Sequence, residues 1–397
     1  MLLPLALRAQ NNTNSLEMVK PDTTNQTDLI DIAKSLFHIK PTDTTGKMHR
    51  KVFFSFLPTT SSIAGGGRAL VTSTNAAFYL GNKSNTSLSS ATFVPYVTFD
   101  GRFGLTLKSN VWTKQNAFNY LGDARFLYYP QYTWGFGGNT NEDDKILAKY
   151  NYIRFYNSVL KGIGKNIFIG LGYDLDYHYN ISSEFDSLPL NDFVKYDYGT
   201  QTGRSTVSSG LAVNLLYDTR NNPANPLPGY YANIIYRVNP KFMGSTENWQ
   251  SLYFDFRKYI SLTQVKDRQN ILAFWSYYWT ALNNNVPYFD LPSIGWDPVQ
   301  QRSGRGIEQN RYRGKGMLYF ESEYRRDITN NGLLGFALFA NVNSVTEQDR
   351  YTFKYWHPAA GFGLRVKFNK TSRTNVTLDY AFSKYYSGLY LNLGETF

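Results

Sequence analysis

The chain has 397 residues, a formal net charge of +11, an aromatic fraction of 17% and no cysteine. The lack of cysteine excludes disulfides and thiolate metal sites, and the absence of a dense Lys/Arg cluster argues against a nucleic-acid-binding protein. No stretch approaches the roughly 20 apolar residues that a membrane-spanning helix needs. A positive net charge suits anionic lipid headgroups or a basic, water-filled lumen.

The first fifty residues differ in composition from the rest of the chain. Residues 1–9 hold an apolar run that ends near the small residue Ala9, and we interpret them as the remainder of a signal peptide. Residues 10–50 are polar and are expected to form a periplasmic N-terminal extension. Within them, Asp28 to Ile39 has apolar residues at helical spacing, with Thr27 or Asp28 as N-cap. A short periplasmic helix, a plug in the mouth of a barrel and a frayed tail are all compatible with this segment.

From Lys51 onward, apolar residues alternate with polar ones. In residues 165–178, for example, Ile167 and Leu171 fall on one side of a strand, whereas Asp174 and Asp176 fall on the other. A period of two without a long apolar run is typical of a strand with lipid on one face and water on the other. The same parity places Arg365, Lys367 and Asp379 on the watery side of later strands.

Counting such segments gives about sixteen strands and an all-β fold. We expect a transmembrane antiparallel β-barrel over residues 51–397, because lipid cannot satisfy the backbone of an open sheet. The alternative is a soluble β-sandwich or propeller, although sandwich strands are shorter and turn more often. The expected strands are 51–58, 68–80, 90–100, 101–112, 121–134, 147–161, 165–178, 205–218, 229–239, 249–262, 269–282, 316–328, 332–343, 357–368, 374–384 and 388–397.

Connection lengths distinguish the two ends of this barrel. The longest connections are 179–204 and 283–315, whereas turns such as 162–164 and 369–373 are short. Outer-membrane barrels have long external loops and short periplasmic turns. Both termini are therefore expected in the periplasm, and 283–315 is the sixth external loop.

Three segments stand out from the strand pattern. The first is a turn fixed by proline and glycine, which comprises Asp218, Thr219, Arg220, Asn221 and Pro223. The second lies in the loop 283–315 and comprises Gly304, Arg305, Gly306 and Ile307. The third is strand 316–328, where Leu318 and Phe320 face lipid, so that Glu321 and Glu323 face the lumen.

Taken in order, these segments resemble the BamA/TamA superfamily of outer-membrane β-barrels, of the bacterial surface antigen type, over roughly residues 50–397. The resemblance implies a periplasmic turn motif between the eighth and ninth strands and a sixth loop that folds back into the lumen. It also implies that Glu321, Glu323 and Asn341 are the lumen partners of Arg305. Without the motif in the loop, the two glutamates would be better explained as counter-charges of lumen cations such as Arg325.

The chain departs from this family at two places. The family has an Asp and a Gly where this chain has Asn341 and Asn343, which weakens the expectation of a second anionic contact to Arg305. Family members normally carry periplasmic POTRA domains, for which residues 10–50 are too short. The sequence therefore resembles a minimal form that has the barrel alone.

The last expected strand closes the barrel. It begins at Gly388 and carries Leu389, Leu391, Leu393 and Phe397 on one side. In the resembled family, the first and last strands meet at a seam that opens sideways into the bilayer. Because strand 51–58 is short and is followed by Gly65–Gly67, we hypothesise that this seam is weakly paired here.

By resemblance, the expected function is insertion or translocation of proteins, or of lipids, at the outer membrane of a Gram-negative bacterium. Expected partners are outer-membrane lipids and lipopolysaccharide, together with unfolded outer-membrane proteins or a periplasmic accessory protein, and no nucleic acid. The alternatives are a passive channel, a barrel hydrolase with a Ser or Asp clustered beside a histidine, and a purely structural scaffold. Because none of His38, His49, His178 and His357 has metal-ligand spacing to another histidine, we expect no enzyme, no metal and no cofactor.

Overall fold

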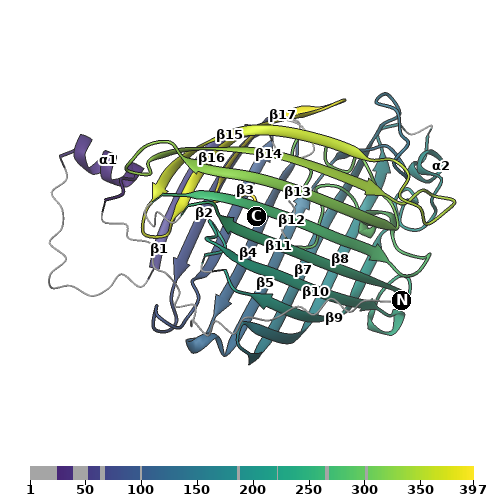
Figure 1. Cartoon of the computed structure of the whole chain (residues 1–397). Helices are drawn as coiled ribbons and strands as arrows, with labels where there is room; N and C mark the ends of the chain where they lie inside the picture. Colours follow the sequence, from purple (N-terminus) through teal and green to yellow (C-terminus); the bar gives the residue numbers. More distant parts are fainter. Residues whose placement is uncertain are drawn as a thin grey trace, which may run out of the picture.

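The computed structural model describes residues 25–38, 52–62, 68–98, 101–185, 188–220, 222–263, 268–299 and 303–397. The segment interpreted as a signal peptide, 1–9, and most of the extension 10–50 lie outside these residues. The described strands form one sheet of 17 strands that curves into a barrel (Figure 1). No helix in the described part of the chain is long and apolar enough to cross a membrane.

The strand order along the chain follows the expected pattern closely. The strands are β1 (Val52–Ser62), β2 (Arg68–Phe78), β3 (Ser89–Thr98), β4 (Phe103–Trp112), β5 (Phe118–Tyr128), β6 (Gln131–Thr133), β7 (Ile146–Gly164), β8 (Ile167–Ser183), β9 (Thr206–Asp218), β10 (Gly229–Asn239), β11 (Trp249–Ser261), β12 (Asn270–Ala281), β13 (Gly316–Asp327), β14 (Leu334–Val345), β15 (His357–Asn369), β16 (Thr374–Ser383) and β17 (Ser387–Leu393). The helices are α1 (Leu29–Leu36) and α2 (Leu190–Val194), with short 3₁₀ turns η1 (Lys114–Asn116), η2 (Lys241–Met243) and η3 (Tyr288–Asp290).

Each strand pairs antiparallel with the next strand in sequence. The one exception is β6, which has three residues and continues β5 along the same neighbour, β7. Leaving β6 aside, the 17 strands reduce to the sixteen that the alternation predicted. The all-β, antiparallel barrel expected from the sequence is therefore confirmed.

The two faces of the barrel wall differ as the parity predicted. Leu171 and Leu338 point outward and are 68% and 51% exposed. In contrast, Asp176, Arg365 and Lys367 point into the lumen and are buried. A one-residue slip of the ladder would exchange these faces, so the contrast in burial fixes the register of the whole sheet.

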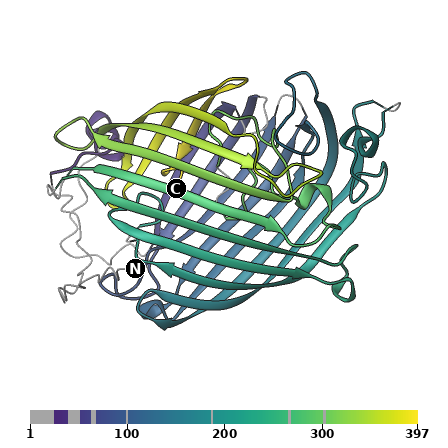
Figure 2. The same ribbon diagram turned by 45° about the vertical axis from the view of Figure 1, so that its right-hand side comes forward.

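The helix α1 lies beside the short turns at one end of the barrel, away from the long loops (Figures 1 and 2). Asp28 caps it, accepting a hydrogen bond at 2.7 Å from the Asp31 amide and completing a capping box. Lys370, in the β15–β16 turn, donates to Asp31 at 2.7 Å, and its own amide donates to Asp28 at 2.8 Å. The helix is thus attached to a turn at the rim. The observed helix, Leu29–Leu36, is shorter than the segment expected to be helical, Asp28 to Ile39.

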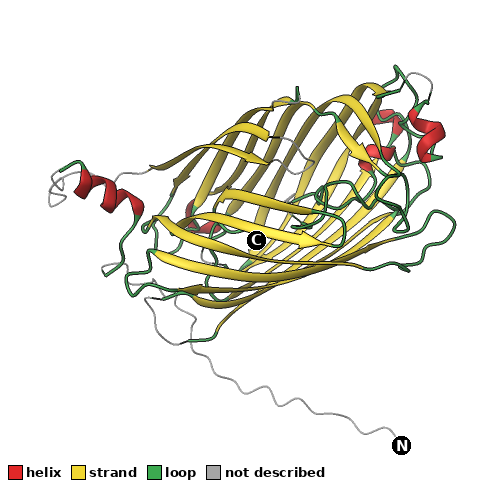
Figure 3. Ribbon diagram, turned by 90° about the horizontal axis from the view of Figure 1, so that it is seen from above, coloured by secondary structure: helices red, strands yellow, loops and turns green. Residues whose placement is uncertain are grey.

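The long connections meet at the opposite end, and one of them enters the barrel. Residues 188–205 carry α2 at the rim, where Figure 3 shows helices in red. Residues 282–299 and 303–315 fold inward between the walls. Ile294, Ile307 and Tyr312 of this sixth loop are buried in one cluster with Trp275 and Tyr319 of the wall. The lumen-inserted sixth loop expected from the resemblance is present.

The first and last strands approach each other without forming a ladder in the described residues. β1 pairs with β2 over its whole length, and β17 pairs with β16 from Ser387 to Leu393. The last strand is shorter than the expected 388–397 because the chain leaves the sheet after Leu393. Phe397, expected on the lipid side of this strand, is instead fully buried inside the barrel.

Candidate functional site in the barrel lumen

The tip of the sixth loop reaches the inner face of strands β13 to β16. Two glycines flank Arg305 there, and Gly306 has a positive φ of 88°. A Cβ atom on Gly306 would lie 2.9 Å from the backbone nitrogen of Phe382 in β16. Only glycine allows both this backbone conformation and this close approach, which explains why the loop tip has glycine beside Arg305.

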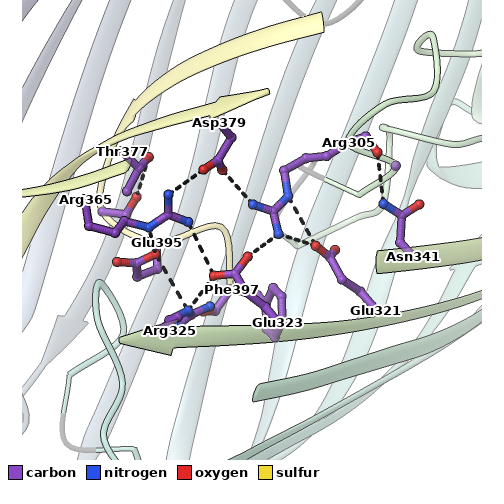
Figure 4. Close-up of polar contacts among 12 residues, drawn as sticks. Arg305, Glu321, Glu323, Arg325, Asn341, Arg365, Thr377, Asp379, Glu395 and Phe397 are labelled. Carbon is purple, nitrogen blue, oxygen red and sulfur yellow. Dashed lines mark hydrogen bonds and ion pairs between the residues drawn. The ribbon is translucent and has the colours of Figure 1, made fainter. Parts of the chain in front are cut away.

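Arg305 forms ion pairs with three carboxylates on two strands, and its side chain is only 3% exposed to solvent (Figure 4). Its Nη1 donates to Oδ2 of Asp379 at 2.6 Å. Its Nε donates to Glu321 at 3.2 Å, and its Nη2 pairs with both Glu321 and Glu323. The guanidinium also lies 3.5 Å from the centroid of the Phe339 ring, a cation–π contact.

Asn341 holds the backbone of the loop tip rather than the guanidinium. Its Nδ2 donates to the carbonyl oxygen of Arg305 at 2.9 Å. Asn341 is thus a partner of Arg305 through the backbone, and the doubt about a second anionic contact was wrong, because Glu321, Glu323 and Asp379 all pair with the guanidinium. The structure thus brings together Arg305, Glu321, Glu323 and Asn341, which come from three different elements.

Arg305 belongs to a larger network of buried charges. Asp379 is shared with Arg365, whose Nη1 pairs with Oδ1. Glu323 is shared with Arg325 at 2.6 Å and with Arg365 at 3.4 Å. The network has three guanidinium groups and four carboxylates: Arg305, Arg325, Arg365, Glu321, Glu323, Asp379 and Glu395.

The β15 backbone makes room for this network at Gly363. A Cβ atom there would fall 1.8 Å from Oδ1 of Asp379 and 2.6 Å from Nη1 of Arg365. Any side chain at Gly363 would therefore displace the carboxylate that joins Arg305 to Arg365. Asp379, Arg365 and Glu395 were not candidates from sequence, although the parity had already placed Asp379 and Arg365 inside the barrel.

The turn motif lines the lumen cavity on the side of the short turns. Asp218 binds Arg220 through two hydrogen bonds, from Nε at 2.9 Å and from Nη2 at 2.8 Å. Thr219 exchanges backbone and hydroxyl bonds with Tyr230 across the turn. Pro223 lines the lumen cavity, and Asn221 lies outside the described residues. From the same segment, Asn222 donates to the carbonyl of Ser372 at 2.7 Å, so the turn reaches across to the β15–β16 turn.

The closing-strand residues divide into two groups. Gly388, Leu389, Leu391 and Leu393 lie in β17 and pair with β16. Phe397 does not, because Gly394 turns the chain inward with a φ of 86°. Its ring lies 5.3 Å from the Trp275 ring and 5.1 Å from the Arg325 guanidinium. Apolar alternation could not reveal this, since an aromatic residue suits a lipid face and an aromatic pocket equally well.

A second polar cluster lines the wall on the other side of the lumen. Asp176 accepts hydrogen bonds from the hydroxyls of Tyr152 and Tyr156, each at 2.5 Å, and from Arg237 at 2.6 Å. Between this wall and the sixth loop lies a cavity of about 660 Å³, which Arg305 and Ile307 also line. The lumen is therefore occupied by the loop and by buried ion pairs, with a cavity on one side of the loop.

Among the described residues, His178 is the histidine that lies within 4.0 Å of a carboxylate. Its Nδ1 lies 3.8 Å from Asp290 of the sixth loop. The hydroxyl of Ser208 donates to Asp290 at 2.6 Å rather than to the histidine. A nucleophilic serine needs the histidine as its hydrogen-bond acceptor, so these three residues are not arranged as a Ser–His pair. No group of three or more potential metal ligands occurs among the described residues.

The barrel is similar in fold to solved structures of BamA and CdiB. It matches BamA from Haemophilus ducreyi lacking POTRA domains 1–3 with a TM-score of 0.51 and 14% identity, over 92% of this chain and 77% of that one. CdiB from Acinetobacter baumannii matches with a TM-score of 0.55 and 12% identity, over 88% of this chain and 61% of its own. For CdiB from Escherichia coli the values are 0.55 and 10%, over 89% and 65%.

These identities show a shared fold and no more. The chain spans less than two thirds of either CdiB chain. No protein-family model and no curated protein matches its sequence. The expected likeness to barrels of the BamA/TamA type is thus confirmed at the level of the fold.

Replacing Arg305 with alanine is expected to destabilise the folded barrel. The change leaves Glu321, Glu323 and Asp379 short of a counter-charge in a dry site, a loss on the order of 3–5 kcal/mol. We expect the variant to lose its folded, fast-migrating gel band at a lower temperature than the unmodified chain. Arg350→Ala is the control, because Arg350 is exposed. Equal melting of all three proteins would show that the loop arginine contributes nothing to stability.

Packing of the sixth loop is expected to depend on pH through Asp290. Burial raises the pKa of the Asp290 carboxyl to about 7 from an ordinary value of 3.8, and the nearby Asp176 carboxylate adds to the rise. Between pH 3.8 and about 7, the Asp290 carboxyl is therefore protonated in the folded state but has lost its proton in the unfolded state. Stability from this group is full at acidic pH and is lost as pH rises toward 7.

Hydrogen exchange over residues 282–299 measures this effect. After correction for the intrinsic exchange rate at each pH, we expect the backbone amides to be more strongly protected at pH 5 than at pH 8. We expect Asp290→Asn to reduce this difference in protection. If the asparagine variant keeps the full pH dependence, another group is responsible.

Proposed function

We propose that this chain is an outer-membrane barrel that inserts proteins into the membrane or translocates them across it. The observation that carries the proposal is the anchoring of Arg305, at the tip of a long loop, on three carboxylates of the lumen wall. This anchoring keeps the loop across the lumen. A barrel whose lumen is blocked by a loop that ion pairs hold in place is suited to regulated opening rather than to steady diffusion of solutes.

The region between β1 and β17 supports the same proposal. Apart from the three-residue β6, each described strand except these two has ladder partners on both sides, and β17 has only seven residues. An unpaired strand edge is a template for another strand. A client segment can therefore pair there at a lower cost than at any other position in the wall.

The outer surface and the N-terminal helix support a location in the outer membrane. The outward side chains are largely apolar, and a chain with a net charge of +11 suits anionic headgroups, including those of lipopolysaccharide. We place both ends of the chain in the periplasm, on the side of the short turns. The exposed apolar residues Ile32, Leu36 and Phe37 at α1 then offer a contact for a periplasmic accessory protein.

Insertion in a bilayer is tested by Leu171→Arg. The outward side chain of Leu171 is 68% exposed, so arginine there fits a water-soluble protein but costs about 2–4 kcal/mol near the middle of a bilayer. We expect weaker folding into lipid vesicles, measured by urea titration, than for Leu171→Ala, which removes the side chain without adding a charge. Equal stability of the two variants would place this face in water.

The activity itself is tested by depletion of the protein in its native cell and quantification of the outer-membrane fraction. We expect a defined set of outer-membrane or exported proteins to decrease. Arg350→Ala is expected to restore them, and Arg305→Ala to restore them incompletely. The competing function is a passive channel. No change in the outer-membrane proteins, together with steady large conductance of the purified chain in planar bilayers, would favour that channel.

A further inference from the structure

Residues 394–397 leave the sheet and bind inside the barrel as a short strap. The Gly394 amide still donates to Asn375 of β16 at 2.8 Å, as a ladder residue would. The next amide, that of Glu395, donates to the carbonyl of Ala224 in the turn segment that lines the lumen cavity. All four strap residues are buried. The strap is therefore a folded part of the interior, connected to an element far from β17 in the sheet.

Two side chains hold the strap. The Glu395 carboxylate accepts from Nε of Arg365 at 2.8 Å and from Asn375 at 2.8 Å, and it lies 3.7 Å from Arg325. The Phe397 ring packs between Trp275, Tyr259 and the Arg325 guanidinium. Arg325 also donates to the Phe397 carbonyl at 3.0 Å. Arg325 thus contacts both side chains that hold the strap, the Glu395 carboxylate and the Phe397 ring.

The same arginines hold the carboxylates that bind the loop. Arg365 joins Glu395 to Asp379, and Arg325 joins Glu395 to Glu323 (Figure 4). Asp379 and Glu323 are in turn bound by Arg305. The side chains of Arg305 and Glu395 do not touch, but each of these two routes between them passes through only one carboxylate and one arginine.

The charge count gives the sign of the coupling. With the loop in place, three guanidinium groups face four carboxylates in this network. When Arg305 leaves, two guanidinium groups face the same four carboxylates, so Glu395 meets more repulsion and weaker pairing. When Glu395 leaves instead, three guanidinium groups face three carboxylates, so one negative charge fewer attracts Arg305. Each element therefore binds more tightly when the other is present, as linkage requires.

We propose that residues 394–397 are a lumenal strap whose seating is coupled to the sixth loop through the shared arginines Arg325 and Arg365. The strap sets the point at which β17 stops, immediately after Leu393. Withdrawal of Arg305 from its carboxylates releases the strap and frees the end of the last strand. The inference concerns the barrel alone, so it stands or falls independently of which client the protein handles.

A single cysteine reports on the strap, because the chain has no other thiol. Thr396→Cys places it at a site that is 4% exposed, so a water-soluble maleimide should react slowly with the folded full-length protein. Adding Arg305→Gln is expected to raise the labelling rate roughly 5- to 150-fold, the usual range of coupling between two sites. Lys384→Cys, at an exposed position, gives the rate of an unprotected thiol.

The matched control is Arg311→Gln in the Thr396→Cys background. Arg311 lies in the same loop and is also buried, but it pairs with Glu142 at 3.3 Å, away from the network. Its loss should leave the labelling rate unchanged. If Arg305→Gln has no effect, or if Arg311→Gln raises the rate equally, the strap is not coupled to the loop through these charges.

The reverse experiment does not depend on the stability of an Arg305 variant. Ile307→Cys places the thiol in the loop tip, where Ile307 is 7% exposed. Glu395→Gln in this background should raise the labelling rate, by a factor similar to that of the forward experiment, because the coupling is reciprocal. An unchanged rate at position 307 in a protein that still shows the folded gel band would overturn the proposal.

Discussion

The structure depends on carboxylates and guanidinium groups that pair inside a nearly dry lumen. Burial of either charge alone is costly, and pairing offsets the cost only when the geometry is good. Arg305 satisfies this condition with three carboxylates from β13 and β16. Because two of these carboxylates are also paired with Arg325 or Arg365, one network of ion pairs holds the loop, the three wall strands β13, β15 and β16, and residues 394–397.

The two-sided wall explains why charges gather there. The outward positions are largely apolar, so most charged side chains of the strands are directed inward, with exceptions such as the exposed Lys161 and Arg326. The lumen then receives more ionic groups than water can reach, and they pair across strands. Asp176 with Arg154 and Arg237 repeats this arrangement on the opposite wall. The interior of this barrel is thus organised by ion pairs and tyrosine hydroxyls as much as by apolar contacts.

Closure by ion pairs is compatible with the opening that the proposed function requires. An apolar core resists local opening because exposed apolar surface gains nothing from water, whereas separated ions can be hydrated again. The inserted loop and the weak junction between β1 and β17 are therefore the natural places for movement in an otherwise continuous ladder.

Much of the candidate site followed from the sequence. Parity put Glu321 and Glu323 inside the barrel, and the family resemblance linked them to Arg305. The pattern could not find Glu395 or the buried position of Phe397, because both follow a turn at Gly394 that alternation does not encode. Nor could it rank Asp379 above the other inward carboxylates, since its contact with Arg305 joins residues 74 positions apart.

The sequence by itself determined the strands, their inward and outward faces and the long loop, because a period of two and the exclusion of charge from lipid are local rules. Only the tertiary structure decided which charges meet, how deep the loop tip lies and where the last strand ends. Those outcomes depend on curvature of the sheet, which brings distant strands to a common interior that no local pattern describes.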